Sequence, residues 1–164
     1  MATGKQALVS LIGAGAASIV LWALPKEEGT RYVPYRDIGG VWTVCDGVTG
    51  PSVIPGRTYS ADECKDMNSI ALLSHAKSVV RCINVPMSDQ RTAGLILFTY
   101  NVGDKAFCSS SLVRRINMND PAACDEILNN WYRAGGKDCR IRSNNCYGVI
   151  NRRTLETQLC KGKA

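Results

Sequence analysis

Apolar residues recur at helical spacing along the second half of the chain, and polar residues that cap helices mark where these helices begin. Ser60-Ala-Asp-Glu63 has the form of a capping box, which predicts a helix from there to about Cys82. Ser88 is the expected N-cap of a second, strongly apolar helix that stops at Gly103. The pattern therefore predicts two helices in the middle of the chain.

Three shorter helices are expected toward the C-terminus. Ser110 or Ser111 begins the first of them. Asp120-Pro121, with proline at the first helical position, begins the second, and Gly135-Gly136 ends it. The last covers about residues 151–161.

A different pattern precedes the helices. Residues 26–59 are charged and rich in turn formers, with one short apolar run, Val41–Cys45, between Gly39-Gly40 and Asp46-Gly47. This run predicts a small β-hairpin lobe at residues 26–60, followed by a larger helical lobe at residues 61–164. The fold class is therefore α+β and mostly helical.

The N-terminal segment, residues 1–25, is expected to be separate from the domain at residues 26–164. Residues 7–24 carry no charge, and as one helix they would span roughly 27 Å, close to the roughly 30 Å of bilayer hydrocarbon. Half of them are Ala, Gly or Ser, including the run at residues 13–18. The segment is therefore a marginal membrane span.

Three interpretations of this segment stay open from its residues alone. A cleaved signal peptide would use Lys5 as its basic end and Ala14-Gly15-Ala16 as its cleavage site, although its apolar region would be short. A permanent anchor would have its N-terminus in the cytoplasm, an orientation that Lys5 weakly favours. The third interpretation is a buried helix of the folded domain, which is compatible with the second.

The formal net charge of +6 comes entirely from the C-terminal fifth of the chain. Residues 1–132 contain twelve basic and twelve acidic residues, whereas residues 133–164 contain eight basic and two acidic residues. Such a patch suits a polyanion such as anionic lipid or the carboxylate-rich bacterial wall, and a solvated basic face without a partner is an equal alternative. No standard nucleic-acid-binding motif is present, so we expect no nucleic-acid partner.

The eight cysteines are dispersed, and none has CxxC spacing. His75 is the only histidine and lies in the middle of a predicted helix, so we expect it to be structural and expect no metal and no cofactor. An even, dispersed set indicates disulfides and an oxidising compartment, with buried free thiols as the alternative. Only one local bridge is expected from spacing, Cys139 with Cys146.

Two acidic residues and a threonine are candidates for glycoside hydrolysis, which needs one carboxylic acid for the leaving oxygen and a second group on the other face. Glu28 is followed nine positions later by Asp37 and six further on by Thr43. The spacing alone is not specific, because such residues on a surface hairpin commonly have no chemical role.

With Gly29, Gly39-Gly40 and Trp42 around it, this pattern resembles the catalytic signature of phage-type lysozymes (glycoside hydrolase family 24). Four further blocks resemble the family in the same order, and the likeness covers about residues 28–160: Phe98–Gly103, Ser111–Asn117, Trp131–Gly136 and Tyr147–Glu156. The chain departs from the family at Val48, where a histidine is usual, which removes a supporting group and not a catalytic one.

The resemblance implies an endolysin, a muramidase that hydrolyses the β-1,4 bond between N-acetylmuramic acid and N-acetylglucosamine in peptidoglycan and lyses the host cell. It implies that Glu28 is the general acid, kept protonated in a desolvated cleft. Asp37 and Thr43 would hold the attacking water on the opposite face, which inverts the anomeric carbon. Glu27 is the rival acid, but it breaks the family spacing by one residue.

The resemblance also implies residues that contact the glycan, and we expect Tyr100, Asn101 and Arg153 among them. Arg153 is in addition expected near Glu28 as a structural partner.

A weakly apolar helix that ends just before Glu28 resembles the signal-arrest-release subclass of endolysins. The resemblance implies a tether in the host inner membrane through residues 7–24, with the N-terminus inside, and later release into the periplasm. A helix half made of Ala, Gly and Ser can pack closely against the domain after release. No cysteine lies in residues 1–44, which favours refolding of this helix over disulfide exchange. We expect a monomer whose partner is peptidoglycan.

The main alternative function is a non-enzymatic cell-wall or membrane-binding protein that retains a lysozyme fold, which the basic C-terminal patch and Val48 favour. A third is a disulfide-rich periplasmic inhibitor, which would not need the set of Glu28, Asp37 and Thr43. The sequence also leaves open a transglycosylase, in which the muramic C6 hydroxyl replaces water.

Overall fold

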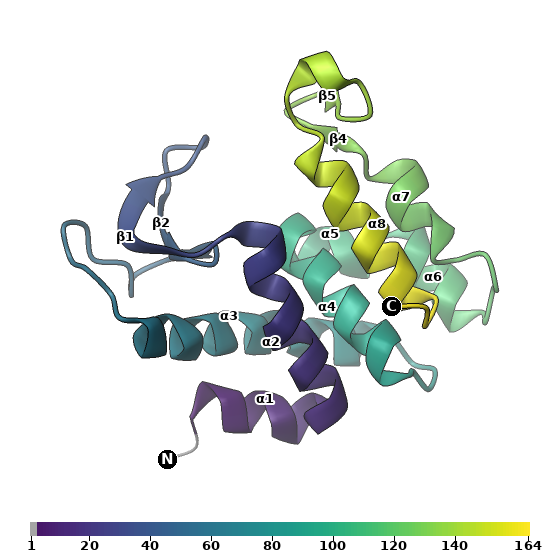
Figure 1. Ribbon diagram of the computed structural model, residues 1–164. Helices are drawn as coiled ribbons and strands as arrows, with labels where there is room; N and C mark the ends of the chain where they lie inside the picture. Colours follow the sequence, from purple (N-terminus) through teal and green to yellow (C-terminus); the bar gives the residue numbers. More distant parts are fainter. Residues whose placement is uncertain (1–2) are drawn as a thin grey trace. The chain divides into compact units, whose positions relative to one another are not determined.

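The computed structural model describes residues 3–164 (Figure 1). The chain divides into two compact units, and the boundary between them falls between residues 74 and 75, within one long helix. The fold is α+β and mostly helical, as predicted. In chain order the elements are α1 Gly4–Ile12, α2 Ala14–Glu28, β1 Arg31–Arg36, β2 Trp42–Cys45, β3 Val48–Thr49, α3 Ala61–Cys82, α4 Asp89–Val102, α5 Asp104–Cys108, α6 Ser111–Asn117, α7 Asp125–Asn130, β4 Arg133–Ala134, β5 Lys137–Asp138, the 3-10 turn η1 Arg142–Asn144, and α8 Gly148–Cys160.

The N-terminal apolar segment is two helices and not one, because the chain breaks at Gly13, whose φ is +85°. Helix α1 packs on α3 through Gly4, whose N–H donates to Asp66 Oδ1 at 3.2 Å and whose position has no room for a side chain beside Ile70. No helix within residues 3–164 is both long and apolar enough to cross a membrane. The two helices bury the following side chains in the folded protein: Leu8, Ala16, Ala17, Val20, Ala23 and Leu24.

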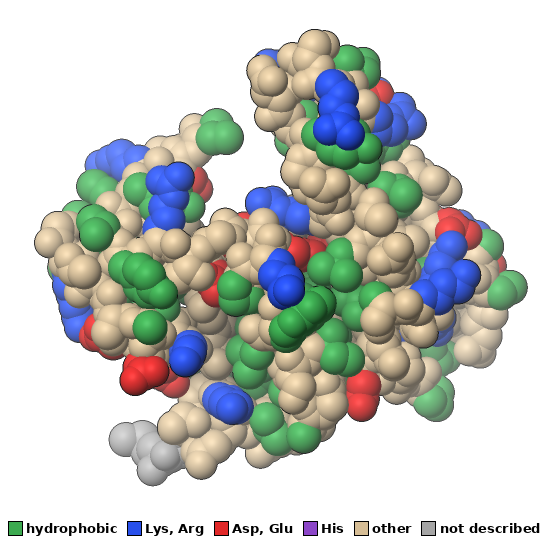
Figure 2. All heavy atoms as spheres, viewed as in Figure 1, with side chains coloured by type: hydrophobic (Ala, Val, Ile, Leu, Met, Phe, Trp, Pro, Cys, Tyr) green, Lys and Arg blue, Asp and Glu red, His purple; other side chains and the backbone are tan. Residues whose placement is uncertain are grey.

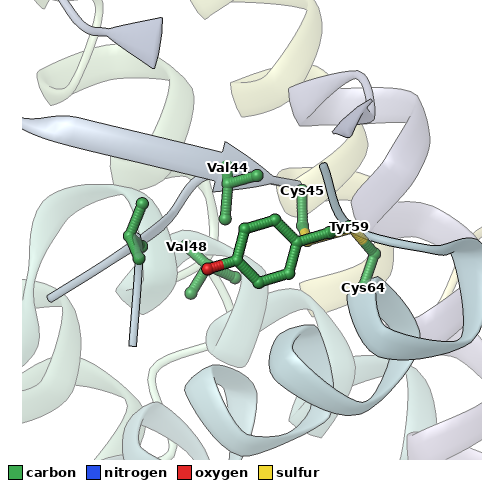
Figure 3. Close-up of a cluster of buried hydrophobic side chains, with 6 residues drawn as sticks. Val44, Cys45, Val48, Tyr59 and Cys64 are labelled. Carbon is green, nitrogen blue, oxygen red and sulfur yellow. A yellow bond between two sulfur atoms is a disulfide. The ribbon is translucent and has the colours of Figure 1, made fainter. Parts of the chain in front are cut away.

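The predicted hairpin is present and gains a third short strand. The sheet is antiparallel in the order β1-β2-β3, with Thr43 of β2 opposite Tyr35 of β1 and Thr49 of β3. Under it lies a small core in which the Tyr59 ring packs near valine side chains and the Cys45–Cys64 disulfide (Figure 3). The disulfide ties β2 to α3, so the lobe is held by a covalent bond as well as by its core.

The capping predictions for the long helices are confirmed. Ser60 Oγ accepts from the Glu63 N–H at 3.1 Å and Glu63 Oε2 accepts from the Ser60 N–H at 2.8 Å, which is the predicted capping box. Ser88 caps α4 by accepting from the Arg91 N–H at 3.1 Å, and Gly103, with φ +93°, ends the helix. Side chains and glycines at helix ends therefore decide where these helices start and stop.

The second unit is built on α4 and α8. Residues 92–99 of α4 are all buried, so this helix is covered on every side. A Cβ at Gly94 would lie 2.8 Å from Leu159 Cβ and 2.9 Å from the Glu156 carbonyl oxygen, so glycine is what lets α8 approach. The disulfides Cys82–Cys108 and Cys124–Cys160 join α3 to α5 and the start of α7 to α8.

The helix predicted between Asp120-Pro121 and Gly135-Gly136 is wrong at both ends, since only residues 125–130 are α-helical. Asp120 Oδ1 accepts from the Ala122 N–H at 2.9 Å, and this local turn delays the helix. Gly135 and Gly136 both have positive φ and form the two-residue turn between β4 and β5, because such a turn requires residues of that conformation. The predicted Cys139–Cys146 disulfide is confirmed.

Candidate active site

Glu28 is the last residue of α2 and is half-buried. The helix ends there because Gly29 adopts φ +70° and donates its N–H to the Pro25 carbonyl at 2.9 Å. Two side chains one turn before it, Ala23 and Leu24, are buried and hold this end of the helix in place. The glycine that follows the acid therefore has a structural reason, which is to turn the chain from α2 into β1.

Asp37 lies in the turn between β1 and β2 and is exposed. Its N–H donates to the Val41 carbonyl at 3.0 Å, and its Oδ1 accepts from the Val41 N–H at 2.9 Å. Gly40 donates its N–H to the Asp37 carbonyl at 2.9 Å, and Arg36 Nη1 donates to the Gly40 carbonyl at 2.8 Å. The carboxylate is thus held by the turn that it helps to form.

Thr43 lies in β2 and is 3% exposed. Its hydroxyl donates to the Val41 carbonyl at 3.1 Å. Asp37 and Thr43 are therefore both hydrogen-bonded to Val41, the carboxylate at its N–H and the hydroxyl at its carbonyl. The structure brings these two predicted residues together, and Val41 is the organising residue that the sequence reasoning missed.

The second unit contains the other predicted residues. Arg153 is 2% exposed, and its Nε donates to the Trp131 carbonyl at 3.0 Å. Its two terminal nitrogens donate to Glu156 Oε2, which is buried, and to Asn101 Oδ1, which belongs to an exposed residue. Arg153 therefore connects the interior of this unit to Asn101 at its surface.

Tyr100 lies beside Asn101 in the last turn of α4 and is half-buried. The His75 ring meets the Tyr100 ring edge-on, with ring centroids 5.2 Å apart. His75 Nδ1 lies 2.6 Å from Asp104 Oδ1, so the histidine joins α3 to the beginning of α5. These contacts give His75 a local structural role in holding the end of α4.

A family model described as phage lysozyme matches residues 25–156, a range that includes Glu28, Asp37 and Thr43. The chain belongs to the phage lysozyme family. It is therefore a lysozyme, a glycoside hydrolase of peptidoglycan, and the predicted family and enzyme class are confirmed.

Known relatives extend this similarity over nearly the whole chain. A SAR-endolysin of Escherichia phage 933W is 40% identical over 161 residues, which cover 94% of this chain and 91% of that protein. The P22 lysozyme structure has a TM-score of 0.72 at 28% identity and covers 87% of this chain and 94% of its own. The active form of the P1 phage endolysin Lyz is similar in fold, with a TM-score of 0.70 at 18% identity over 98% of this chain and 94% of its own.

Proposed function

We propose that this lysozyme is an inverting muramidase in which Glu28, Asp37 and Thr43 carry out the cleavage of the bond between N-acetylmuramic acid and N-acetylglucosamine. The observation that carries the proposal is the shared attachment of Asp37 and Thr43 to Val41, on the hairpin that follows Glu28. Membership of the phage lysozyme family supports the substrate and the type of reaction.

Glu28 is the general acid in this proposal. Its carboxyl group donates a proton to the glycosidic oxygen as the bond to the anomeric carbon breaks, and positive charge develops on the sugar ring. Half-burial suits this role, since it limits the access of water to the carboxyl group. The acid also needs a fixed position, and the buried end of α2 together with the Gly29 cap supports that.

Asp37 and Thr43 act on the water that attacks the opposite face. The Asp37 bond to Val41 uses Oδ1, so Oδ2 of this exposed side chain can take a proton from the water. Thr43 gives its own hydroxyl proton to the Val41 carbonyl, so its oxygen can only accept the other water proton. Attack from this side inverts the anomeric carbon and produces an α-anomer.

Asn101 and Tyr100 are proposed to contact the glycan. Arg153 holds Asn101 Oδ1 and is itself buried, which supports a positioning role for Arg153 behind Asn101. The guanidinium occupies one acceptor position of Asn101 Oδ1 and so fixes the orientation of the amide, whose NH2 group can donate to the sugar.

The N-terminal segment is proposed to have two locations in turn, first the host inner membrane and then the folded domain in the periplasm. Similarity to the SAR-endolysin of Escherichia phage 933W supports the first location. Burial of the apolar face of α1 and α2 supports the second. Straightening the break at Gly13 would join the two helices into one uncharged helix at residues 7–24.

A peptidoglycan assay tests the catalytic assignment. Glu28→Gln removes the acidic proton and is expected to lower the rate about 10²–10⁴-fold. Glu27→Gln is the matched control, because it makes the same chemical change one residue earlier on the same helix. Circular dichroism of both variants checks that the fold is intact. Loss of activity in Glu27→Gln with activity retained in Glu28→Gln would show that the acid is wrongly assigned.

A further inference from the structure

A short segment of the second unit is held by hydrogen bonds and a disulfide, although it has almost no apolar interior. Residues 132–147, which we call the cystine-clamped hairpin, comprise β4, β5 and η1 and are closed by the Cys139–Cys146 disulfide. Of its side chains only Cys139 is buried. The Cys139 N–H donates to the Tyr132 carbonyl at 3.0 Å, and Asn144 Nδ2 donates to the Asp138 carbonyl at 2.8 Å. Hydrogen bonds and one disulfide hold its shape in place of a core.

The cystine-clamped hairpin is strongly basic. It contains four basic side chains and a single acidic one, all within sixteen residues, and the basic ones are Arg133, Lys137, Arg140 and Arg142. Lys and Arg side chains gather on the hairpin in the space-filling view, at the top of the picture (Figure 2). Asp138 forms an ion pair with Arg140, whose Nη2 lies 2.7 Å from Asp138 Oδ2, and it also interacts electrostatically with Arg133. The four basic side chains still exceed the single acidic one, so the hairpin keeps a net positive charge.

Aromatic rings hold these arginines in fixed positions. The Arg142 guanidinium lies 3.5 Å from the centroid of the Tyr147 ring, and Arg140 lies 3.7 Å from that of Tyr132. Arg133 lies 5.3 Å from the same Tyr132 ring. An arginine that is already ordered loses less side-chain entropy when it binds an anion.

The base of the hairpin is attached to the residues that hold Asn101. Trp131, the residue just before the hairpin, accepts a hydrogen bond from Arg153 at its carbonyl, and its ring lies edge-on to Phe98 at 5.2 Å. The same Arg153 donates to Asn101 Oδ1. Within this unit, the basic segment is therefore next to the part of the surface that is proposed to contact glycan.

We propose that the cystine-clamped hairpin binds the carboxylates of the peptide stems that peptidoglycan carries on its muramic acid residues. This inference rests on the proposed function, and it assigns the hairpin to the peptide part of the substrate. Guanidinium groups match carboxylates in shape and charge, and pairs of this kind are stronger than neutral hydrogen bonds. A lipid surface fits less well, because the hairpin exposes a single large aliphatic side chain, Ile141, and so lacks the apolar face that membrane insertion needs.

The test compares binding by two charge-removing pairs in the full chain, with all disulfides formed. Lys137→Gln with Arg142→Gln removes two charges from the hairpin, and Lys105→Gln with Lys163→Gln removes two charges from exposed sites outside it. Both pairs are made in Glu28→Gln protein, so that the substrate is not consumed during the measurement. The probes are intact peptidoglycan, phosphatidylglycerol vesicles, and glycan strands that an amidase has stripped of their peptides. The lactyl carboxylates that the amidase frees on these strands are then amidated, so that the stripped glycan carries no carboxylate.

We expect the hairpin pair to weaken binding to intact peptidoglycan about tenfold, since each exposed charge contact adds up to about a few-fold in affinity. Binding to stripped glycan is expected to stay unchanged, and the control pair is expected to bind both glycans like the parent protein. Three results would overturn the inference: unchanged binding to intact peptidoglycan, equal loss on stripped glycan, or a loss confined to the vesicles. Binding is read without catalysis, so failure of the muramidase assignment would appear separately, as activity retained in Glu28→Gln.

Discussion

Replacing Gly94 by alanine would test how closely α4 and α8 approach each other. The new Cβ would lie 2.8 Å from Leu159 Cβ, 2.9 Å from the Glu156 carbonyl oxygen and 3.0 Å from the Cys160 nitrogen. Two of these three atoms belong to the backbone of α8, so rotation of a side chain cannot relieve the clash and the helix itself has to shift. Overpacking costs about 1–3 kcal/mol or more, while the better helix propensity of alanine restores about 1 kcal/mol.

We therefore expect Gly94→Ala to lower the free energy of unfolding by about 1–2 kcal/mol and Tm by roughly 2–8 °C for a chain of this size. Because α8 carries Arg153, which holds Asn101, kcat/KM on peptidoglycan should fall as well. Gly148→Ala is the matched control, since no atom lies within 4 Å of its added Cβ. Circular dichroism melting and urea unfolding measure both variants. A Gly94→Ala protein as stable as Gly148→Ala would refute the close approach of the two helices.

Three further changes have defined outcomes. Arg153→Met removes the cation beside the buried Glu156 and should lower the free energy of unfolding, measured in urea, by about 3–5 kcal/mol. An unchanged midpoint of urea unfolding would show that the Arg153–Glu156 pair does not stabilise the fold. Arg140 lowers the pKa of Asp138 to about 2 from its ordinary value of 3.8. The ionised carboxylate therefore stabilises the fold fully at pH values above 3.8, and this stabilisation is lost as the pH falls through 2. The Tm difference between wild type and Asp138→Asn should therefore vanish in strong acid, and a difference that persists there contradicts the ion pair. Gly15→Leu with Ser18→Leu changes two exposed positions of α2, so the fold should tolerate both substitutions while insertion of the segment into lipid becomes more favourable. The double variant should stay in the membrane fraction and lyse cells later than wild type. Fractionation and lysis timing like those of wild type would argue against a membrane stage.

Local sequence signals predict the starts of α3 and α4, because capping depends on residues only a few positions apart. The Ser60-to-Glu63 box and the Ser88 cap are examples, and both are present in the structure. A glycine is a less specific signal, because the same residue can end a helix or form a hairpin turn. Gly103 ends α4 as expected, but Gly135-Gly136 forms the β4–β5 turn, and Gly13 breaks a segment that was expected to be one helix.

The sequence indicates candidate residues for the site but not their geometry. Glu28, Asp37 and Thr43 are candidates because of their spacing and the family pattern that it resembles. The joint attachment of the last two to Val41 depends on the register of the hairpin, which spacing does not specify. Three of the four disulfides join elements that are distant in sequence, and only the short Cys139–Cys146 loop could be expected from the chain alone.

The measurement that tests the central claim most directly is proton NMR of the products in the first minutes of cleavage of an uncrosslinked peptidoglycan oligomer. If Glu28 protonates the leaving oxygen while Asp37 and Thr43 hold a water on the opposite face, the new reducing end is N-acetylmuramic acid and appears first as the α-anomer. The same signal should be absent with Glu28→Gln. A β-anomer appearing first, a 1,6-anhydro end, or a new reducing end on N-acetylglucosamine would each contradict the account.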